Sequence, residues 1–197
     1  TTILLILFLL KRKFLNVNNK SLAFMHPNCS AQGGGEKVLW AMIKAIINDK
    51  KIKKDKSIER IVIYVRSDEE KSKQQIIEST KKCFGLSIDQ NNSHIQLELI
   101  KINLCKYADP HKWRFLTIIM EAICSNLATI EAIFRFSPEI YIDSTGYGYA
   151  LCIPKILSLG QTKTFAYVHY PIMQRDMIKA IKNESYNNKS FISNNEV

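Results

Sequence analysis

A chain of 197 residues is long enough for one sizeable α/β domain and too short for two domains of that kind. Apolar residues make up 46% and charged residues 23% of the sequence, which is ordinary for a globular protein and predicts a buried core. The net charge of +10 favours an anionic partner, such as a phosphate group, a membrane surface or a nucleic acid.

The five cysteines are scattered, odd in number and without any C-x-x-C spacing. This pattern favours reduced thiols in a reducing compartment over a disulfide framework or a zinc site. The histidines also lack metal-ligand spacing, so no metal site is expected.

The chain begins with an apolar run, Ile3 to Leu10, which the basic residues Lys11, Arg12 and Lys13 follow. The run is shorter than the roughly 20 residues that span a bilayer. Because the chain does not begin with Met, we interpret residues 1–20 as the inner end of a truncated membrane anchor with its basic flank. Such positive charges stay on the cytoplasmic side, so the domain behind them is expected in the cytosol. A signal peptide is disfavoured, since its positive charges precede the apolar stretch.

Strands and helices are predicted to alternate from residue 21 onward. Hydrophobic patterns predict strands at 21–26, 60–65, 95–102, 139–143 and 164–170, and helices at 36–47, 67–84, 113–136 and 149–159. This β-α-β-α-β-α-β-α-β order predicts an α/β, Rossmann-like, doubly wound parallel sheet with right-handed crossovers and the first strand at its centre. The polar tail, 183–197, is expected to be poorly ordered.

Two of the predicted segments have alternative interpretations. The basic run KKIKKDK, residues 50–56, is either a solvated loop or a contact with anionic lipid head groups. The helix at 113–136 is apolar over more than one stripe, so it is either deeply buried or rests partly on lipid. Nucleic-acid binding is supported by charge alone, because no aromatic residues interleave with the basic run.

Three consecutive glycines, Gly33, Gly34 and Gly35, lie between the first strand and the first helix. Bare backbone N–H groups at a helix N-terminus would hold a phosphate or a diphosphate. The spacing matches neither a P-loop nor the dinucleotide fingerprint. A tight turn without a ligand is the alternative.

His26, Asp143 and His169 each fall at the carboxyl end of a predicted strand. Ligands of doubly wound sheets bind outside these strand ends, so we expect all three side chains at the same edge as the glycine loop. Each has a structural alternative: a hydrogen-bonded histidine for His26 and His169, and an Asx-type turn for Asp143. In the functional interpretation, Asp143 accepts hydrogen bonds from sugar hydroxyls.

Three segments in order, FMHPNCSAQGGGEKVLW, EIYIDSTGYGYALCIPKIL and FAYVHYPIMQRDMI, carry a resemblance to a known family. Together they resemble the amino-terminal half of the asparagine-linked glycosylation α-1,2-mannosyltransferases, which elongate the dolichol-linked oligosaccharide with mannose from GDP-mannose. The resemblance runs from about Leu22 to the carboxyl end.

The resemblance implies a retaining GT-B glycosyltransferase on the cytosolic face of the endoplasmic reticulum membrane, with no metal and no cofactor. Residues 21–182 would form its Rossmann-like acceptor-side domain, and residues 183–197 would begin a missing region that holds the donor domain. The implied substrates are GDP-mannose and a dolichyl-diphosphate-linked oligosaccharide. Other mannosyltransferases of the pathway are further partners, and nucleic acid is not a partner.

The resemblance also implies roles for individual residues. His169 matches the catalytic histidine at the reacting sugar, and Gly33, Gly34 and Gly35 would lie against the donor diphosphate. His26, Asp143 and Tyr147 would contact the acceptor or the sugar. The fragment alone is expected to be inactive, and the alternative is a non-catalytic, membrane-associated, Rossmann-like phosphate-binding module.

Overall fold

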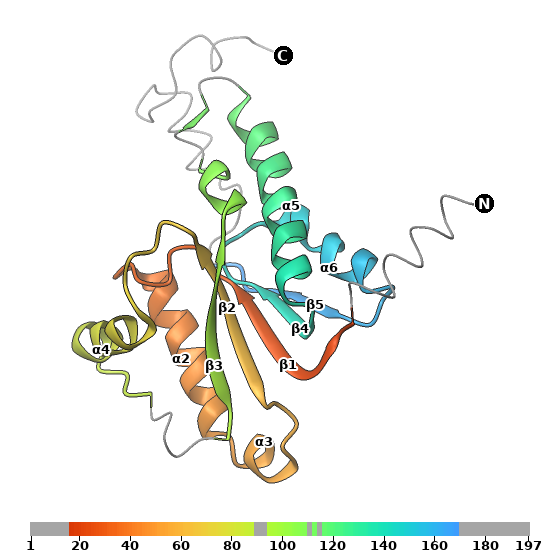
Figure 1. Cartoon of the computed structure of the whole chain (residues 1–197). Coiled ribbons are helices and arrows are strands. Elements are labelled where there is room, and N and C mark those ends of the chain that lie inside the picture. The colour runs from red at the N-terminus through yellow and green to blue at the C-terminus, as the bar shows by residue number, and fades with distance from the viewer. Residues whose placement is uncertain (1–15, 89–93, 110–111, 114–115, 170–197) are drawn as a thin grey trace. The chain divides into compact units, whose positions relative to one another are not determined.

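The computed structural model describes residues 16–88, 94–109, 112–113 and 116–169 (Figure 1). They contain a parallel sheet with the strand order β3-β2-β1-β4-β5. The strands are β1 (Asn18–Met25), β2 (Arg60–Arg66), β3 (Gln96–Ile102), β4 (Pro138–Asp143) and β5 (Lys163–Ala166). The predicted α/β, Rossmann-like sheet with the first strand at its centre is confirmed.

Helices cover both faces of this sheet. They are α2 (Gly34–Asn48), α3 (Lys50–Asp55), α4 (Lys73–Phe84), α5 (Thr117–Arg135) and α6 (Cys152–Leu157), with short 3-10 helices η1 (Leu104–Tyr107) and η3 (Gly148–Ala150). Figure 1 shows α2 and α4 on one face, and α5 and α6 on the other. Right-handed crossovers between parallel strands produce this two-sided arrangement.

The side chains of β1 alternate between two cores. Phe24 packs with Trp40 and Ile43 of α2 on one face. Met25 packs with Ala128 of α5 and the residues around it on the other. Because successive side chains of a strand point to opposite faces, the central strand belongs to both cores.

The lysine run forms a helix, so its prediction as a loop is wrong, whereas its lysines are exposed to solvent as expected. Asp49 caps α3 by accepting hydrogen bonds from the backbone N–H groups of Lys51 and Ile52, at 2.8 and 2.9 Å. Ile52 packs against the core beneath α2 and α4. One cap and one apolar contact were enough to order this basic stretch.

Two other predicted elements are shorter in the structure. Helix α4 begins after Ser72, which forms a capping box with Gln75, rather than at residue 67. Strand β5 ends at Ala166 rather than at residue 170.

The chain divides into two compact units, Thr1–Tyr167 and Val168–Val197, and the sheet belongs to the first. Residues 1–15 of the predicted anchor end, residues 170–182 of the predicted domain, and the predicted tail at 183–197 lie outside the described residues. The proposed domain boundaries at these positions stay predictions.

Candidate active site at the carboxyl edge of the sheet

The loops that follow β1, β2 and β4 meet at the carboxyl edge of the sheet. The backbone N–H of His26 donates to the carbonyl of Tyr64, at 3.2 Å, and the N–H of Ser144 donates to the carbonyl of Met25, at 3.3 Å. Met25 also pairs in register with Asp143. The expectation that His26, Asp143 and the glycine loop share one edge is therefore confirmed.

The glycine loop forms the N-terminus of α2. Gly33 is the N-cap with extended backbone (φ −87°, ψ 177°), and no side chain caps the helix. None of the three glycines has a positive φ, and a Cβ on Gly34 would meet nothing within 4 Å. Neither turn geometry nor packing requires glycine at position 34, which disfavours the tight-turn alternative. Bare backbone there leaves room for a close approach.

Glu36, in the first turn of α2, has a contact that sequence reasoning missed. Its side chain is 13% exposed, and its Oε1 lies 3.6 Å from Nε2 of His26. A Cβ on Gly33 would approach Glu36 Oε2 to 2.6 Å, so the carboxylate occupies the space beside this glycine. Its position three residues after the N-cap, where acidic side chains favour the helix dipole, was the available signal.

His26 links the two loops of the site. Its Nδ1 lies 2.9 Å from Ser144 Oγ, and this hydroxyl donates its proton to the Met25 carbonyl, at 3.1 Å. With its proton directed to the Met25 carbonyl, Ser144 Oγ offers an acceptor to an Nδ1–H of His26. Glu36, His26 and Ser144 therefore form a buried chain of contacts between residues far apart in the sequence.

Asp143 adopts the geometry of its structural alternative. The side chain is buried, and its Oδ1 accepts hydrogen bonds from the N–H groups of Thr145 and Gly146, at 3.0 and 3.3 Å. Gly146 has a φ of 104°, which only glycine adopts without strain. This is an Asx-type turn. A contact between Asp143 and a sugar stays a prediction.

Tyr147 lies beneath the same edge and is almost fully buried. Burial raises the pKa of its hydroxyl, and Cys105, Glu121 and Asp143 raise it further. The phenol therefore remains protonated and can both donate and accept a hydrogen bond.

Arg66, at the carboxyl end of β2, adds a cation that sequence reasoning did not select. Its Nε and one terminal nitrogen donate to Asp68, at 2.9 and 2.6 Å. These hydrogen bonds raise the pKa of Arg66 and lower the pKa of Asp68. The bidentate pair fixes the orientation of both side chains at this edge of the sheet, and its two charges cancel.

His169 belongs to the second unit, and the position of that unit relative to the sheet is not determined. Its convergence with His26 and Asp143 therefore stays a prediction. Tyr167, two residues earlier, still follows the sheet, because its N–H donates to the carbonyl of Asp143, at 2.7 Å.

The described residues at this edge include buried cysteines but no cluster of metal ligands. Among the described residues, no group of three His, Cys, Asp or Glu side chains could hold a metal ion. All five cysteines are free thiols. Burial raises the pKa values of Cys29 and Cys105 to about 12, so these two thiols stay protonated.

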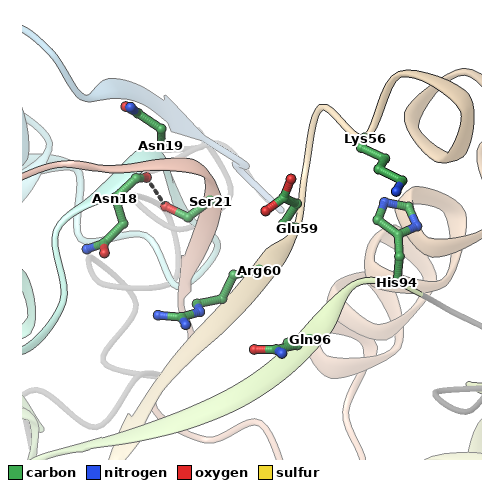
Figure 2. Close-up of a pocket in the computed structure, with 8 residues that line it drawn as sticks. All are labelled: Asn18, Asn19, Ser21, Lys56, Glu59, Arg60, His94 and Gln96. Carbon is green, nitrogen blue, oxygen red and sulfur yellow. Dashed lines mark hydrogen bonds between the residues drawn. The ribbon is translucent and has the colours of Figure 1, made fainter.

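A cavity of about 560 Å³ lies at the opposite edge, where strands β1 to β3 begin (Figure 2). Two of its charged groups have ion-pair partners: Glu59 lies 2.7 Å from Lys20, and Arg60 lies 3.6 Å from Glu98. Ligands of parallel α/β sheets bind at the carboxyl edge instead. We therefore place the candidate active site at the glycine loop and not in this cavity.

Comparison with known proteins connects this site to one family. Residues 19–197 match a family model described as ALG11 mannosyltransferase N-terminus. Several relatives carry the name GDP-Man:Man(3)GlcNAc(2)-PP-Dol alpha-1,2-mannosyltransferase. The relative from Dictyostelium discoideum is 33% identical over 92% of this chain, that from Candida glabrata 35% over 82%, and that from Homo sapiens 31% over 90%.

The chain spans about a third of the length of these relatives, with 34%, 30% and 34% of the three sequences covered. No solved structure matches the chain.

Proposed function

Because the chain belongs to the family described as ALG11 mannosyltransferase N-terminus, we propose that it is the amino-terminal part of a GDP-mannose-dependent α-1,2-mannosyltransferase. The match of residues 19–197 to that family is the observation that carries the proposal. The relatives' name supplies the donor, GDP-mannose, and the acceptor, a dolichyl-diphosphate-linked oligosaccharide. Because the chain spans a third of these relatives, the transfer is assigned to the longer protein.

The glycine loop is the proposed contact for the donor diphosphate. The first N–H groups of α2 have no side-chain cap, and the helix dipole places positive charge at this end. The open space beside Gly34 supports an approach of phosphate oxygens to the backbone. Glu36 turns its negative charge toward His26, which reduces its repulsion of an anionic ligand.

His169 is the proposed catalytic residue of a retaining transfer that uses neither a metal nor a cofactor, within a GT-B fold. His26, Asp143 and Tyr147 are the proposed contacts on the acceptor side. The protonated hydroxyl of Tyr147 supports this role, because it can bind a sugar hydroxyl without adding charge.

The proposed location is the cytosolic face of the endoplasmic reticulum membrane. The acceptor in the relatives' name carries a dolichol lipid, which stays in the bilayer, so the enzyme has to work at the membrane surface. Other mannosyltransferases of the pathway are proposed partners, since the product of one step is the acceptor of the next.

A non-catalytic phosphate-binding module would have the same strand order and glycine loop, but the name that the relatives share does not favour it. Purified full-length protein is to be incubated with GDP-mannose and the dolichol-linked acceptor, and mannose transfer measured. We expect transfer by the wild type, and a loss of about a hundredfold or more for His169→Ala with retained GDP-mannose binding. Donor binding without transfer by the wild type would favour the module.

A further inference from the structure

Helix α5 is apolar on two opposite sides, and its larger apolar side chains are on the outer one. The side facing the sheet buries mostly small side chains, namely Cys124, Ser125, Ala128, Thr129 and Ala132, with Ile133 beside them. The outer side carries Ile119, Ile123, Leu127 and Phe134, each between 45% and 55% exposed. A helix of a water-exposed domain ordinarily has the reverse arrangement.

The outer side chains form a continuous stripe. Ile119, Ile123 and Leu127 follow each other at four-residue spacing, and Phe134 falls on the same side two turns later. Glu121 is the charged residue between Ile119 and Leu127 in the sequence, and helical spacing places it on the side of α5 away from the stripe. At its margin, the Glu131 carboxylate accepts hydrogen bonds from the N–H groups of Asn103 and Leu104, at 3.0 and 2.8 Å, so its charge is held against the domain.

Elements next to α5 expose further apolar side chains. Helix α6 and η3 pack beside α5; Ile156 of α6 is 63% exposed and Tyr149 of η3 is 59% exposed, and Leu159, after the end of α6, is 62% exposed. Lys155 of α6 is exposed as well. Several large exposed apolar side chains on packed neighbouring elements, with a basic side chain among them, are typical of a surface that binds a partner or a membrane.

We propose that the outer faces of α5 and α6 dock this domain onto a lipid bilayer. The inference rests on the proposed function, because the acceptor in the relatives' name is attached to a lipid. Large aliphatic side chains without hydrogen-bonding groups fit acyl chains, which offer no polar partners. A protein partner would more commonly meet aromatic and Arg side chains within a polar rim.

The geometry specifies a helix that lies on the membrane. Among the described residues, α5 is the one helix long and apolar enough to cross a bilayer, with a mean hydropathy of 1.5. Its small-residue side, however, is packed against the sheet. The helix therefore contacts lipid along one side, parallel to the surface.

The same geometry argues against the lysine run as part of this contact. Helix α3 packs with the core beneath α2 and α4, and α5 covers the opposite face of the sheet. A flat bilayer against α5 is therefore separated from α3 by the sheet. This makes α3 an internal control for the orientation.

Two variants, each with one added tryptophan, test the orientation in the full chain. Ile123→Trp places an indole on the outer stripe of α5, and Lys53→Trp places one on exposed α3. Both variants keep Trp40 and Trp113, so quenching by vesicles of brominated phosphatidylcholine and phosphatidylserine is compared with that of the wild type. We expect additional quenching for Ile123→Trp and none for Lys53→Trp.

Three other results would overturn the proposal. They are no vesicle binding, additional quenching for Lys53→Trp alone, and equal quenching of wild type and Ile123→Trp in vesicle-bound protein. A second copy covering the stripe would appear as a concentration-dependent dimer without vesicle binding. A segment of the longer protein covering it would abolish the quenching of Ile123→Trp in the full-length form.

A triple variant, Ile119→Ser, Ile123→Ser and Leu127→Ser, tests the energetic contribution of the stripe. These side chains are exposed, so we expect unchanged thermal unfolding and a loss of vesicle partitioning of about tenfold or more. The loss should be independent of salt, because it removes apolar contact and not charge. Replacing the five lysines of residues 50–56 with Gln is the matched control and should leave the salt-independent partitioning unchanged. Unaltered vesicle partitioning of the triple variant would refute the role of the stripe.

Assays of the full-length protein separate this proposal from the proposed function. With an acceptor on a short, water-soluble lipid, the triple variant should transfer mannose like the wild type, whereas with dolichol-linked acceptor in vesicles its rate should fall. If the wild type transfers to neither acceptor, the proposed function fails, and the quenching of Ile123→Trp still decides the docking.

Discussion

At the scale of single residues, the contacts of His26 determine how the two loops of the candidate site are held. His26 and Ser144 are 118 positions apart in the sequence, and Glu36 approaches the other side of the imidazole ring. All three side chains are largely buried, so each lost contact leaves a polar group with fewer partners. The chain of contacts therefore positions the glycine loop relative to the end of β4.

Glu36→Gln should weaken this chain, because the amide keeps the shape but loses the negative charge beside His26. We expect the free energy of unfolding to fall by about 1–2 kcal/mol, measured by urea denaturation at neutral pH. Glu70→Gln, at an exposed position, is the control and should change stability little. Equal stability of both variants would show that the Glu36 contact does not stabilise the loop.

Gly34→Val tests whether the glycine loop is a ligand site or a structural turn. A Cβ there meets nothing within 4 Å and the backbone φ is not positive, so folding and the melting temperature should change little. In the full-length protein, the branched side chain would occupy the proposed diphosphate position, and we expect a strongly raised KM for the proposed donor, GDP-mannose. A folded variant with a normal KM would show that the diphosphate does not bind at this loop.

Gly33→Ala is the companion substitution with the opposite expectation. Its Cβ would lie 2.6 Å from Glu36 Oε2, so the carboxylate has to move away from His26. We expect a lowered melting temperature in differential scanning calorimetry, and a smaller decrease when Glu36→Gln is already present. If the decreases in melting temperature caused by Gly33→Ala and Glu36→Gln add in the double variant, the two substitutions do not act through the same contact.

At the scale of elements, Glu131 connects α5 to the segment that follows β3. Its carboxylate accepts from the N–H groups of Asn103 and Leu104 and pairs with Arg135 one turn later, at 2.7 Å. Burial alone would raise the pKa of Glu131, but these hydrogen bonds outweigh it, and the pKa is lowered. The ionised form is therefore stabilised by folding.

A lowered pKa in the folded state gives the pH dependence a definite sign. The stabilisation by Glu131 is fully present above the pKa of the unfolded chain, 4.5, and is lost as the pH falls through the folded value. Glu131→Gln should cost about 1–2 kcal/mol at neutral pH and progressively less in acid, measured by urea denaturation. A pH-independent difference would contradict this explanation.

At the scale of the whole domain, two cores share one sheet. The core beneath α2 contains Phe24 and Ile43, the core beneath α5 contains Met25 and Ala128, and β1 contributes to both. A change in one core therefore acts on the other through the central strand. The domain should unfold as one cooperative unit.

Ile43→Ala tests this coupling. Truncating a fully buried isoleucine should cost about 2–5 kcal/mol. Native-state hydrogen exchange should show the protection of the amides around Ala128 in α5 reduced by the same free energy. Reduced protection in α2 alone would show that the two faces unfold separately.

The order of elements and the central position of the first strand could be predicted from sequence patterns alone. Continuous β-branched runs such as residues 60–65 indicate strands buried on both faces, and amphipathic runs between them indicate crossover helices. The glycines between a strand and a helix also predicted the loop that forms the N-terminus of α2. These features are local, since backbone geometry and burial leave their pattern within a few neighbouring residues.

The contacts of the site and the orientation of α5 were decided by the tertiary structure alone. No local pattern brings Glu36 and Ser144 to the same imidazole, because the pairing depends on β1 and β4 lying side by side. Periodicity also could not choose between two apolar sides of α5. Packing made that choice: the small side chains from Cys124 to Ala132 let the helix backbone approach the sheet closely, and this turned Ile119, Ile123 and Leu127 outward.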